Sequence, residues 1–195
     1  MPSLKHSVPK KIVLIGASTG GPAHIQKIIT ALPKLHNTSV IVAQHMAKGF
    51  IPSFAKRLKS HSINPINVAE STMALESAHI YFCCGYTKIY KEYSNLVFSQ
   101  QSAPLEAFNP DINMLFHSFS PFIQNIQCLS VILTGIGDDG VSGCKELVAN
   151  GALALTETQQ SAVVDGMPSR ARESIENIQV DSLEKIIKSI VEFCE

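Results

Sequence analysis

The chain has 195 residues, of which 45% are hydrophobic and 16% are charged, and its formal net charge is zero. This composition supports a sizeable hydrophobic core and excludes a disordered chain. The balanced charge argues against a strong electrostatic attraction to nucleic acid or to anionic lipid, because both require clustered lysine and arginine.

The N-terminal segment and the cysteines indicate where the protein works. Residues 1–11 are polar, with two prolines and three lysines, and do not resemble a signal peptide. No apolar run reaches the length of a transmembrane helix. The number of cysteines is odd and none forms a C-x-x-C pair, which indicates reduced thiols rather than disulfides or a zinc site. We therefore expect a cytoplasmic protein with no bound metal and no membrane insertion. The cysteines are Cys83, Cys84, Cys128, Cys144 and Cys194.

Hydrophobic periodicity predicts an alternation of strands and helices along the chain. The predicted strands are 12–15, 39–43, 80–84, 88–93, 96–99, 130–134 and 152–156. The predicted helices are 21–32, 50–60, 112–120, 140–150, 168–174 and 183–193. This order favours an α/β fold, a doubly wound and mostly parallel sheet with helices on both faces.

Two further expectations concern organisation. The short strands 88–93 and 96–99 are separated by turn residues and predict an antiparallel hairpin, at the edge of the sheet or as a small separate addition. We find no linker, repeat or low-complexity segment, so we expect a single domain over residues 1–195 with a flexible N-terminal segment at 1–10.

The turn after the first strand carries the strongest chemical signal. Residues 12–15 are apolar, Gly16 and Gly20 flank Ser18 at G-x-S-x-G spacing, and Pro22 suits the first turn of a helix. In this setting a serine lies on a sharp turn, and the amides at the helix start can stabilise an oxyanion. Glycine-rich turns of this kind also bind phosphates, and Ser18 stands where G-x-G-x-x-G has its second glycine. A nucleophile, a phosphate loop and a structural turn all remain open at this point.

Polar residues follow three of the predicted strands. Ser18 follows the first strand, His45 follows 39–43, and Asp138 and Asp139 lie in the glycine-rich segment after 130–134. Because ligands bind beyond the carboxyl ends of parallel strands, these residues are expected on one rim. A serine, an imidazole and a carboxylate are the parts of a catalytic triad. Their order along the chain differs from the Ser…Asp…His order of α/β-hydrolases, which excludes that family. The spacing does not separate Asp138 from Asp139, and either aspartate also suits a helix cap.

With these motifs, the chain resembles the catalytic domain of the chemotaxis protein-glutamate methylesterases, the CheB family. The resemblance runs from about Lys11 to Glu173. Its anchors are residues 15–22, 44–46 with 49–50, 110–111 with 115–118, 133–140 and 163–168.

The resemblance implies a role for each matching residue. Ser18 corresponds to the nucleophile, His45 to the general base, and Asp139, which directly precedes Gly140, to the carboxylate that orients the histidine. It implies a serine hydrolase that demethylates glutamate methyl esters on the cytoplasmic domains of methyl-accepting chemoreceptors and releases methanol. Deamidation of glutamine is a second implied reaction. Neither reaction requires a metal or an organic cofactor.

The resemblance also implies residues around the triad. Thr19 and Ile136 correspond to positions of the oxyanion hole, and Met46 belongs to the motif that lies against substrate. Ile136 stands where the family usually has methionine, and Ala47 where it has proline. Residues 79–85 also depart from the family pattern. About ten residues precede the first strand, so we expect no N-terminal receiver domain.

Two alternatives belong to other functional classes. One is a nucleotide-binding module that uses the Gly16–Gly21 turn, although a third glycine at fingerprint spacing and an acidic residue after the second strand are missing. The other is a catalytically silent, receptor-binding adaptor. The sequence does not indicate an oligomeric state.

Overall fold

The computed structural model describes residues 7–101 and 108–195. Its main sheet has seven strands in the order β3-β4-β2-β1-β7-β8-β9, and every neighbouring pair is parallel. The strands are β1 (Lys11–Ala17), β2 (Thr38–Gln44), β3 (Ile66–Val68), β4 (Ile80–Phe82), β7 (Gln127–Ile132), β8 (Leu153–Glu157) and β9 (Gln179–Asp181). The order runs outward in both directions from β1, which is the doubly wound arrangement that the sequence predicts.

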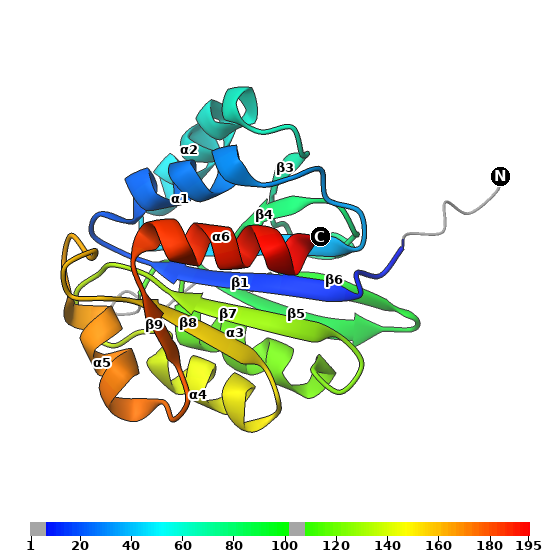
Figure 1. Cartoon of the computed structure of the whole chain (residues 1–195). Coiled ribbons are helices and arrows are strands. Elements are labelled where there is room, and N and C mark those ends of the chain that lie inside the picture. The colour runs from blue at the N-terminus through cyan, green and yellow to red at the C-terminus, as the bar shows by residue number, and fades with distance from the viewer. Residues whose placement is uncertain (1–6, 102–107) are drawn as a thin grey trace, which may run out of the picture.

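Helices cover both faces of this sheet, as Figure 1 shows. On one face lie α1 (Gly21–Ala31), α2 (Ile51–Leu58) and α6 (Leu183–Cys194). On the other lie α3 (Ile112–Phe119), α4 (Val141–Ala149) and α5 (Gly166–Ser174). Short 3-10 turns at Lys48–Phe50, Lys59–His61 and Ser120–Phe122 adjoin α2 and α3. None of the helices in the described residues is both long and apolar enough to span a bilayer.

The core consists of two layers, one on each side of the sheet. Along β1, Ile12 and Leu14 belong to one buried cluster, and Val13 and Ile15 belong to the other. Strands covered on both faces read as continuous apolar runs, which is why 12–15 carries no polar alternation. Each fully buried aliphatic side chain contributes about 1.5–3 kcal/mol of transfer free energy. The two layers therefore hold β1 and its neighbours as the most constrained part of the molecule.

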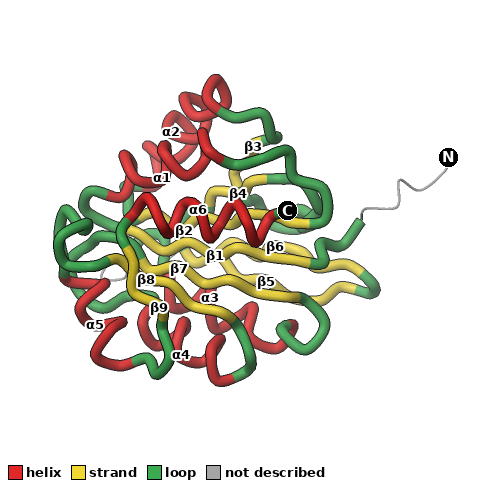
Figure 2. Tube along the Cα trace, viewed as in Figure 1, coloured by secondary structure: helices red, strands yellow, loops and turns green. Residues whose placement is uncertain are grey.

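The predicted hairpin forms a sheet of its own. β5 (Tyr86–Glu92) and β6 (Asn95–Gln101) pair antiparallel and make a two-stranded sheet separate from the parallel one. Leu96 and Phe98 from β6 are buried in the same cluster as Leu115 and Phe116 of α3. The hairpin therefore acts as a cover on the α3 face (Figure 2).

Two short strands, β3 and β9, were not expected from the sequence. Each has three residues and pairs with one neighbour, β3 with β4 and β9 with β8. β9 reads Gln-Val-Asp, which has no apolar run. Pairing to an existing sheet edge, rather than local periodicity, defines such strands.

The expected flexible segment at 1–10 falls partly outside the described residues, since residues 1–6 are not described. In its described part, the Ser7 carbonyl accepts a hydrogen bond from the Ser77 N–H at 2.9 Å. The Lys10 N–H donates to the Asn37 carbonyl at 2.8 Å. These bonds attach residues 7–10 to the sheet layer.

Candidate active site

The candidate site lies at the carboxyl ends of the three central strands. In the β1–β2 register, Ala17 pairs with Gln44, so Ser18 and His45 are the next residues on adjacent strands. The His45 N–H donates to the Ala17 carbonyl at 2.9 Å. From the other neighbour, β7, the Thr134 carbonyl accepts the Ser18 N–H at 2.9 Å. Backbone pairing alone therefore brings the serine beside the histidine.

The serine turn depends on glycine. Gly20 adopts a left-handed backbone with φ 87°, and a methyl group there would lie 2.6 Å from Val163 Cβ. The Gly21 N–H closes the turn on the Ser18 carbonyl at 2.9 Å, and Pro22 follows in the first turn of α1. The side chain of Ser18 is partly exposed at the tip of this turn.

His45 and Asp139 form a direct contact. His45 Nε2 lies 2.7 Å from Asp139 Oδ2, and the Asp139 side chain is 1% exposed. The same carboxylate accepts the Ile112 N–H and the Asn113 N–H, each at 2.9 Å, at the start of α3. Because both backbone partners donate to this carboxylate, His45 Nε2 meets an acceptor and is the ring nitrogen that carries the proton. Nδ1 is then the basic nitrogen of the ring, and it makes no hydrogen bond to a described residue.

The structure contains no hydrogen bond between the described side chains of Ser18 and His45. Ser18 Oγ bonds to no described residue, so of the two contacts in a Ser–His–Asp line the structure contains the one between His45 and Asp139. A serine hydroxyl reorients by rotation about one bond, and such contacts tighten when substrate binds. Asp138 is exposed, and its carboxylate makes no hydrogen bond or ion pair with a described residue, which separates it clearly from the buried Asp139.

Gln44 is a site residue that the sequence reasoning did not single out. Its side chain is buried, and Nε2 donates to the carbonyls of Ser18 at 2.8 Å and of His45 at 2.9 Å. One amide group therefore fastens the two turns to each other. The available signal was a polar residue that ends an otherwise apolar buried strand.

The aromatic ring of Phe108 covers His45. The two rings are stacked, with centroids 4.9 Å apart and an interplanar angle of 1°. Phe108 is itself 49% exposed. The imidazole is thus held between a carboxylate at its edge and an aromatic face, which limits its orientations.

The remaining predicted residues surround Ser18. The N–H groups of Thr19 and Ile136 bond to no other described residue, and both residues are exposed. Gly135, which precedes Ile136, packs so closely that a methyl group on it would lie 2.6 Å from Ser18 Cβ. Met46 is half-buried and its N–H donates to the Asn109 carbonyl at 2.9 Å.

Met46 also borders a hollow of about 290 Å³ beside the site. The other lining residues come from the start of α1 and from α2 with the turn before it, namely Pro22, Phe50, Ser53, Phe54 and Arg57. Phe50 is 66% exposed there. This hollow offers an apolar surface within reach of a substrate held at Ser18.

Asp111 adds a second carboxylate near the triad. It is the N-cap of α3 and accepts the Met114 N–H at 2.6 Å. Burial raises the pKa of Asp111 above its ordinary value; the bond from Met114 partly offsets this, and the negative charge of Asp139 raises it further.

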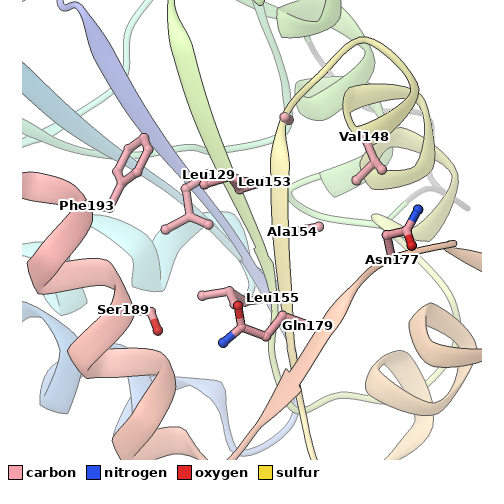
Figure 3. A pocket seen from close by; sticks show the side chains of 10 residues that line it. Leu129, Val148, Leu153, Ala154, Leu155, Asn177, Gln179, Ser189 and Phe193 are labelled. Carbon is pink, nitrogen blue, oxygen red and sulfur yellow. The ribbon is translucent and has the colours of Figure 1, made fainter.

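Another hollow lies at the opposite end of the sheet. It has a volume of about 250 Å³ and is lined by the starts of β7 and β8 together with β9, α4 and α6, including Leu129, Leu153 and Phe193 (Figure 3). Since the strands are parallel, this end is remote from Ser18. Across residues 7–101 and 108–195, no cluster of three or more histidine, cysteine, aspartate or glutamate side chains suits a metal ion.

The fold and the site define a doubly wound α/β protein that gathers a serine, an imidazole and a carboxylate at one sheet edge. The CheB methylesterase family model matches residues 13–190. The chain therefore belongs to the CheB methylesterase family, in agreement with the resemblance of its motifs.

Individual relatives agree with this. The "Protein-glutamate methylesterase/protein-glutamine glutaminase" of Halalkalibacterium halodurans is 34% identical, over 98% of this chain and 57% of the relative. The protein of the same name from Bacillus subtilis is 34% identical, over 95% of this chain and 53% of the relative. The chain thus spans about half the length of these curated relatives. The CheB methylesterase catalytic domain of Thermotoga maritima has a TM-score of 0.85 at 29% identity, covering 95% of this chain and 99% of that domain.

Proposed function

We propose that this chain hydrolyses glutamate methyl esters on the cytoplasmic domains of methyl-accepting chemoreceptors, with Ser18 as nucleophile, His45 as general base and Asp139 as the carboxylate that orients it. The observation that carries the proposal is the 2.7 Å contact between His45 Nε2 and Asp139 Oδ2, one strand away from Ser18. Membership of the family supports the substrate class.

The contact of His45 Nε2 with Asp139 supports a proton path through Nδ1. Nδ1 accepts the Ser18 hydroxyl proton while Oγ attacks the ester carbonyl carbon. The tetrahedral intermediate collapses as the same nitrogen returns the proton to the methoxy oxygen, and methanol leaves. Water then attacks the acyl-enzyme by the same route and releases the glutamate carboxylate. With a glutamine substrate, ammonia takes the place of methanol, which gives deamidation.

The developing oxyanion needs donors that are free. The Ser18 N–H is already bonded to the Thr134 carbonyl, so it does not serve. The N–H groups of Thr19 and Ile136 have no such partner among the described residues, and we assign them to the oxyanion hole. Each donor of this kind contributes roughly 3 kcal/mol to transition-state stabilisation. A backbone donor does not depend on its side chain, so isoleucine in the usual methionine position leaves this role intact.

Met46 and the hollow beside it are the proposed contact for the substrate protein next to the ester. An apolar surface at this position fits a receptor segment with an apolar side chain near the modified glutamate. The chemistry uses only side chains and backbone of this chain, with no metal or organic cofactor.

Methanol release from methylated receptor membranes tests the proposal. The wild-type chain should release methanol, and Ser18→Ala should release none above background while retaining its thermal midpoint. A fluorophosphonate probe should label the wild type at Ser18, which also distinguishes an enzyme from a silent adaptor. Methanol release that persists in Ser18→Ala would reject the nucleophile. Saturable nucleotide binding in an unreactive protein would favour the phosphate-loop alternative instead.

A further inference from the structure

Glu157 is a buried carboxylate that the proposed reaction does not use. It ends β8 and is 0% exposed. Oε2 accepts the Thr134 N–H at 2.7 Å and lies 3.3 Å from His24 Nδ1, while Oε1 accepts the Ser161 hydroxyl at 2.9 Å. All of these groups can donate, so the carboxylate is fully partnered inside the protein.

Such a group is costly to bury. An ionised carboxylate removed from water is destabilising unless it is paired and hydrogen-bonded, and replacing such a pair by apolar residues is often neutral or stabilising. His24, its partner, is only 8% exposed in its side chain and lies on the α1 face that otherwise buries Ile25, Ile28 and Ile29. Stability alone does not explain a buried carboxylate and imidazole in this layer.

The groups held by Glu157 lead directly to the nucleophile. The Thr134 N–H donates to the Glu157 carboxylate, and the Thr134 carbonyl accepts the Ser18 N–H at 2.9 Å. The Thr134 hydroxyl donates to the Thr19 carbonyl at 2.8 Å and accepts the Val164 N–H at 2.9 Å. One threonine therefore fixes both residues of the serine turn, and Glu157 fixes that threonine.

His24 holds the other side of the same turn. α1 begins at Gly21, directly after the turn, and His24 lies in its first turn. The contact with Glu157 ties this end of α1 to β8. The turn is thus clamped between Thr134 on one side and α1 on the other.

We propose that Glu157 and His24 are positioning residues for Ser18, acting through Thr134 and the start of α1; this inference rests on the proposed serine esterase function. Glu157 acts as the acceptor that holds the Thr134 N–H, and His24 as a donor that completes the hydrogen bonding of the Glu157 carboxylate. A displacement of about 1 Å at a reacting atom costs about 10²-fold in rate, so loss of the clamp should act on turnover rather than on binding.

Steady-state methanol release and fluorophosphonate labelling of Ser18 test this. Glu157→Ala should lower kcat by about 10²-fold with KM nearly unchanged, because the Thr134 N–H loses its acceptor. Glu157→Gln keeps a carbonyl oxygen for that N–H and should recover most of kcat. His24→Ala should lower kcat, and His24→Gln, which keeps a donor, should restore it.

A matched control separates positioning from stability. Ile190→Ala empties a buried site on α6, where the side chain is 0% exposed. It should lower the thermal midpoint at least as much as Glu157→Ala without changing kcat. Hydrogen exchange of the Ser18 amide should accelerate in Glu157→Ala and stay slow in Glu157→Gln and Ile190→Ala.

Three results would overturn the inference: wild-type kcat in folded Glu157→Ala, a change in KM alone, or a Gln variant as impaired as the Ala variant. If the wild type releases no methanol but Ser18 still labels, the substrate proposal fails, and the labelling rates of the variants still test the positioning. If Ser18 does not label, exchange of its amide remains the readout for the clamp.

Discussion

At the scale of single residues, the orientation of His45 decides the chemistry. The ring is bonded to Asp139 through Nε2, so the proton acceptor is Nδ1, the nitrogen closer to the ring's attachment point. The stacked Phe108 ring keeps the imidazole in this plane. The carboxylate sets the tautomer, and the tautomer determines which nitrogen is basic.

Asp139→Asn is therefore expected to remove most activity. The Asn113 N–H bonds Oδ1, whereas His45 Nε2 and the Ile112 N–H share Oδ2. If the amide oxygen of asparagine keeps the Asn113 bond, its NH₂ group takes the Oδ2 position, loses the Ile112 bond and forces the proton of His45 onto Nδ1. The ring can then no longer accept the Ser18 proton, and kcat for methanol release should fall by about 10²–10⁴-fold. Asp138→Asn, a change at the exposed neighbour, is the control and should behave as the wild type. Equal losses in the two variants would reject the assignment of Asp139.

Asp111 predicts a pH dependence of stability. Its pKa is raised in the folded state, so the folded protein binds this proton more tightly than the unfolded chain does. The stability that this group contributes is present at acidic pH, below its unfolded pKa, and is lost as pH rises through the folded pKa. Asn caps a helix as well as Asp but does not titrate. The free energy of unfolding of Asp111→Asn, relative to the wild type, should thus increase from about pH 4 to about pH 7. Denaturant titrations at both pH values measure this, and a difference that is constant or decreases with pH would contradict it.

At the scale of elements, the site depends on loops that approach within van der Waals contact. The loop after β7 passes against the serine turn at Gly135, where a side chain has no room. Its backbone bonds reach the segment before α5 and α5 itself, since the Gly135 N–H donates to the Val164 carbonyl and the Gly135 carbonyl accepts the N–H of Met167 in α5. The turn after β1 and the segment before α5 therefore both pack against Gly135.

Gly135→Ala is expected to impair catalysis through this contact. The new methyl group would lie 2.6 Å from Ser18 Cβ and closer still to Met167 Sδ, so the serine turn must shift. Overpacking of this kind costs about 1–3 kcal/mol in stability, and the displaced nucleophile should lower kcat by at least about 10-fold. Gly49→Ala adds the same methyl group where no atom lies within 4 Å and should change neither quantity. A Gly135→Ala protein with unaltered kcat would show that the turn tolerates the shift.

Part of this site could be predicted because ligands bind beyond the carboxyl ends of parallel strands, and those ends are recognisable from local sequence. Ser18 and His45 follow buried apolar runs, and such runs are visible in the sequence. Asp138 and Asp139 could not be separated by pattern, because the difference lies in the N–H groups of Ile112 and Asn113, which are 27 and 26 residues away from Asp139. Glu157 lies just beyond the predicted strand 152–156 and carried no signal, because its partner His24 is 133 residues distant in the chain. The short strands β3 and β9 escaped prediction for the same reason, because an existing sheet edge defines them.

At the scale of the whole molecule, the two core layers enclose every cysteine. Cys83 and Cys84 are adjacent in sequence but belong to opposite layers, as their alternation on an extended chain requires. Burial raises the pKa of each thiol, to about 11 for Cys144 and to about 12 for Cys194. Thiolates are the reactive form of cysteine. Burial therefore lowers the reactivity of these thiols in two ways, because it blocks access of reagents and disfavours ionisation.

Thiol labelling should consequently report unfolding of the whole domain. In native buffer near neutral pH, Ellman's reagent should react with almost none of the five cysteines, and in denaturant all five should react at once. Labelling measured across a denaturant series should follow the loss of circular dichroism. A thiol that reacts quickly in the native state would reveal a part of the core that opens on its own.

The pairing of β1 with β2 also governs how the site loses its shape. Ser18 and His45 follow β1 and β2, two of the three central strands, and are bridged by the Gln44 amide, so they separate only when the centre of the sheet comes apart. Asp139 and Phe108, in contrast, approach the imidazole from segments outside that ladder. If those segments open on heating before the centre of the sheet does, the carboxylate and the Phe108 ring leave the imidazole while Ser18 and His45 stay together. Activity would then be lost reversibly, through a change of tautomer in an intact sheet.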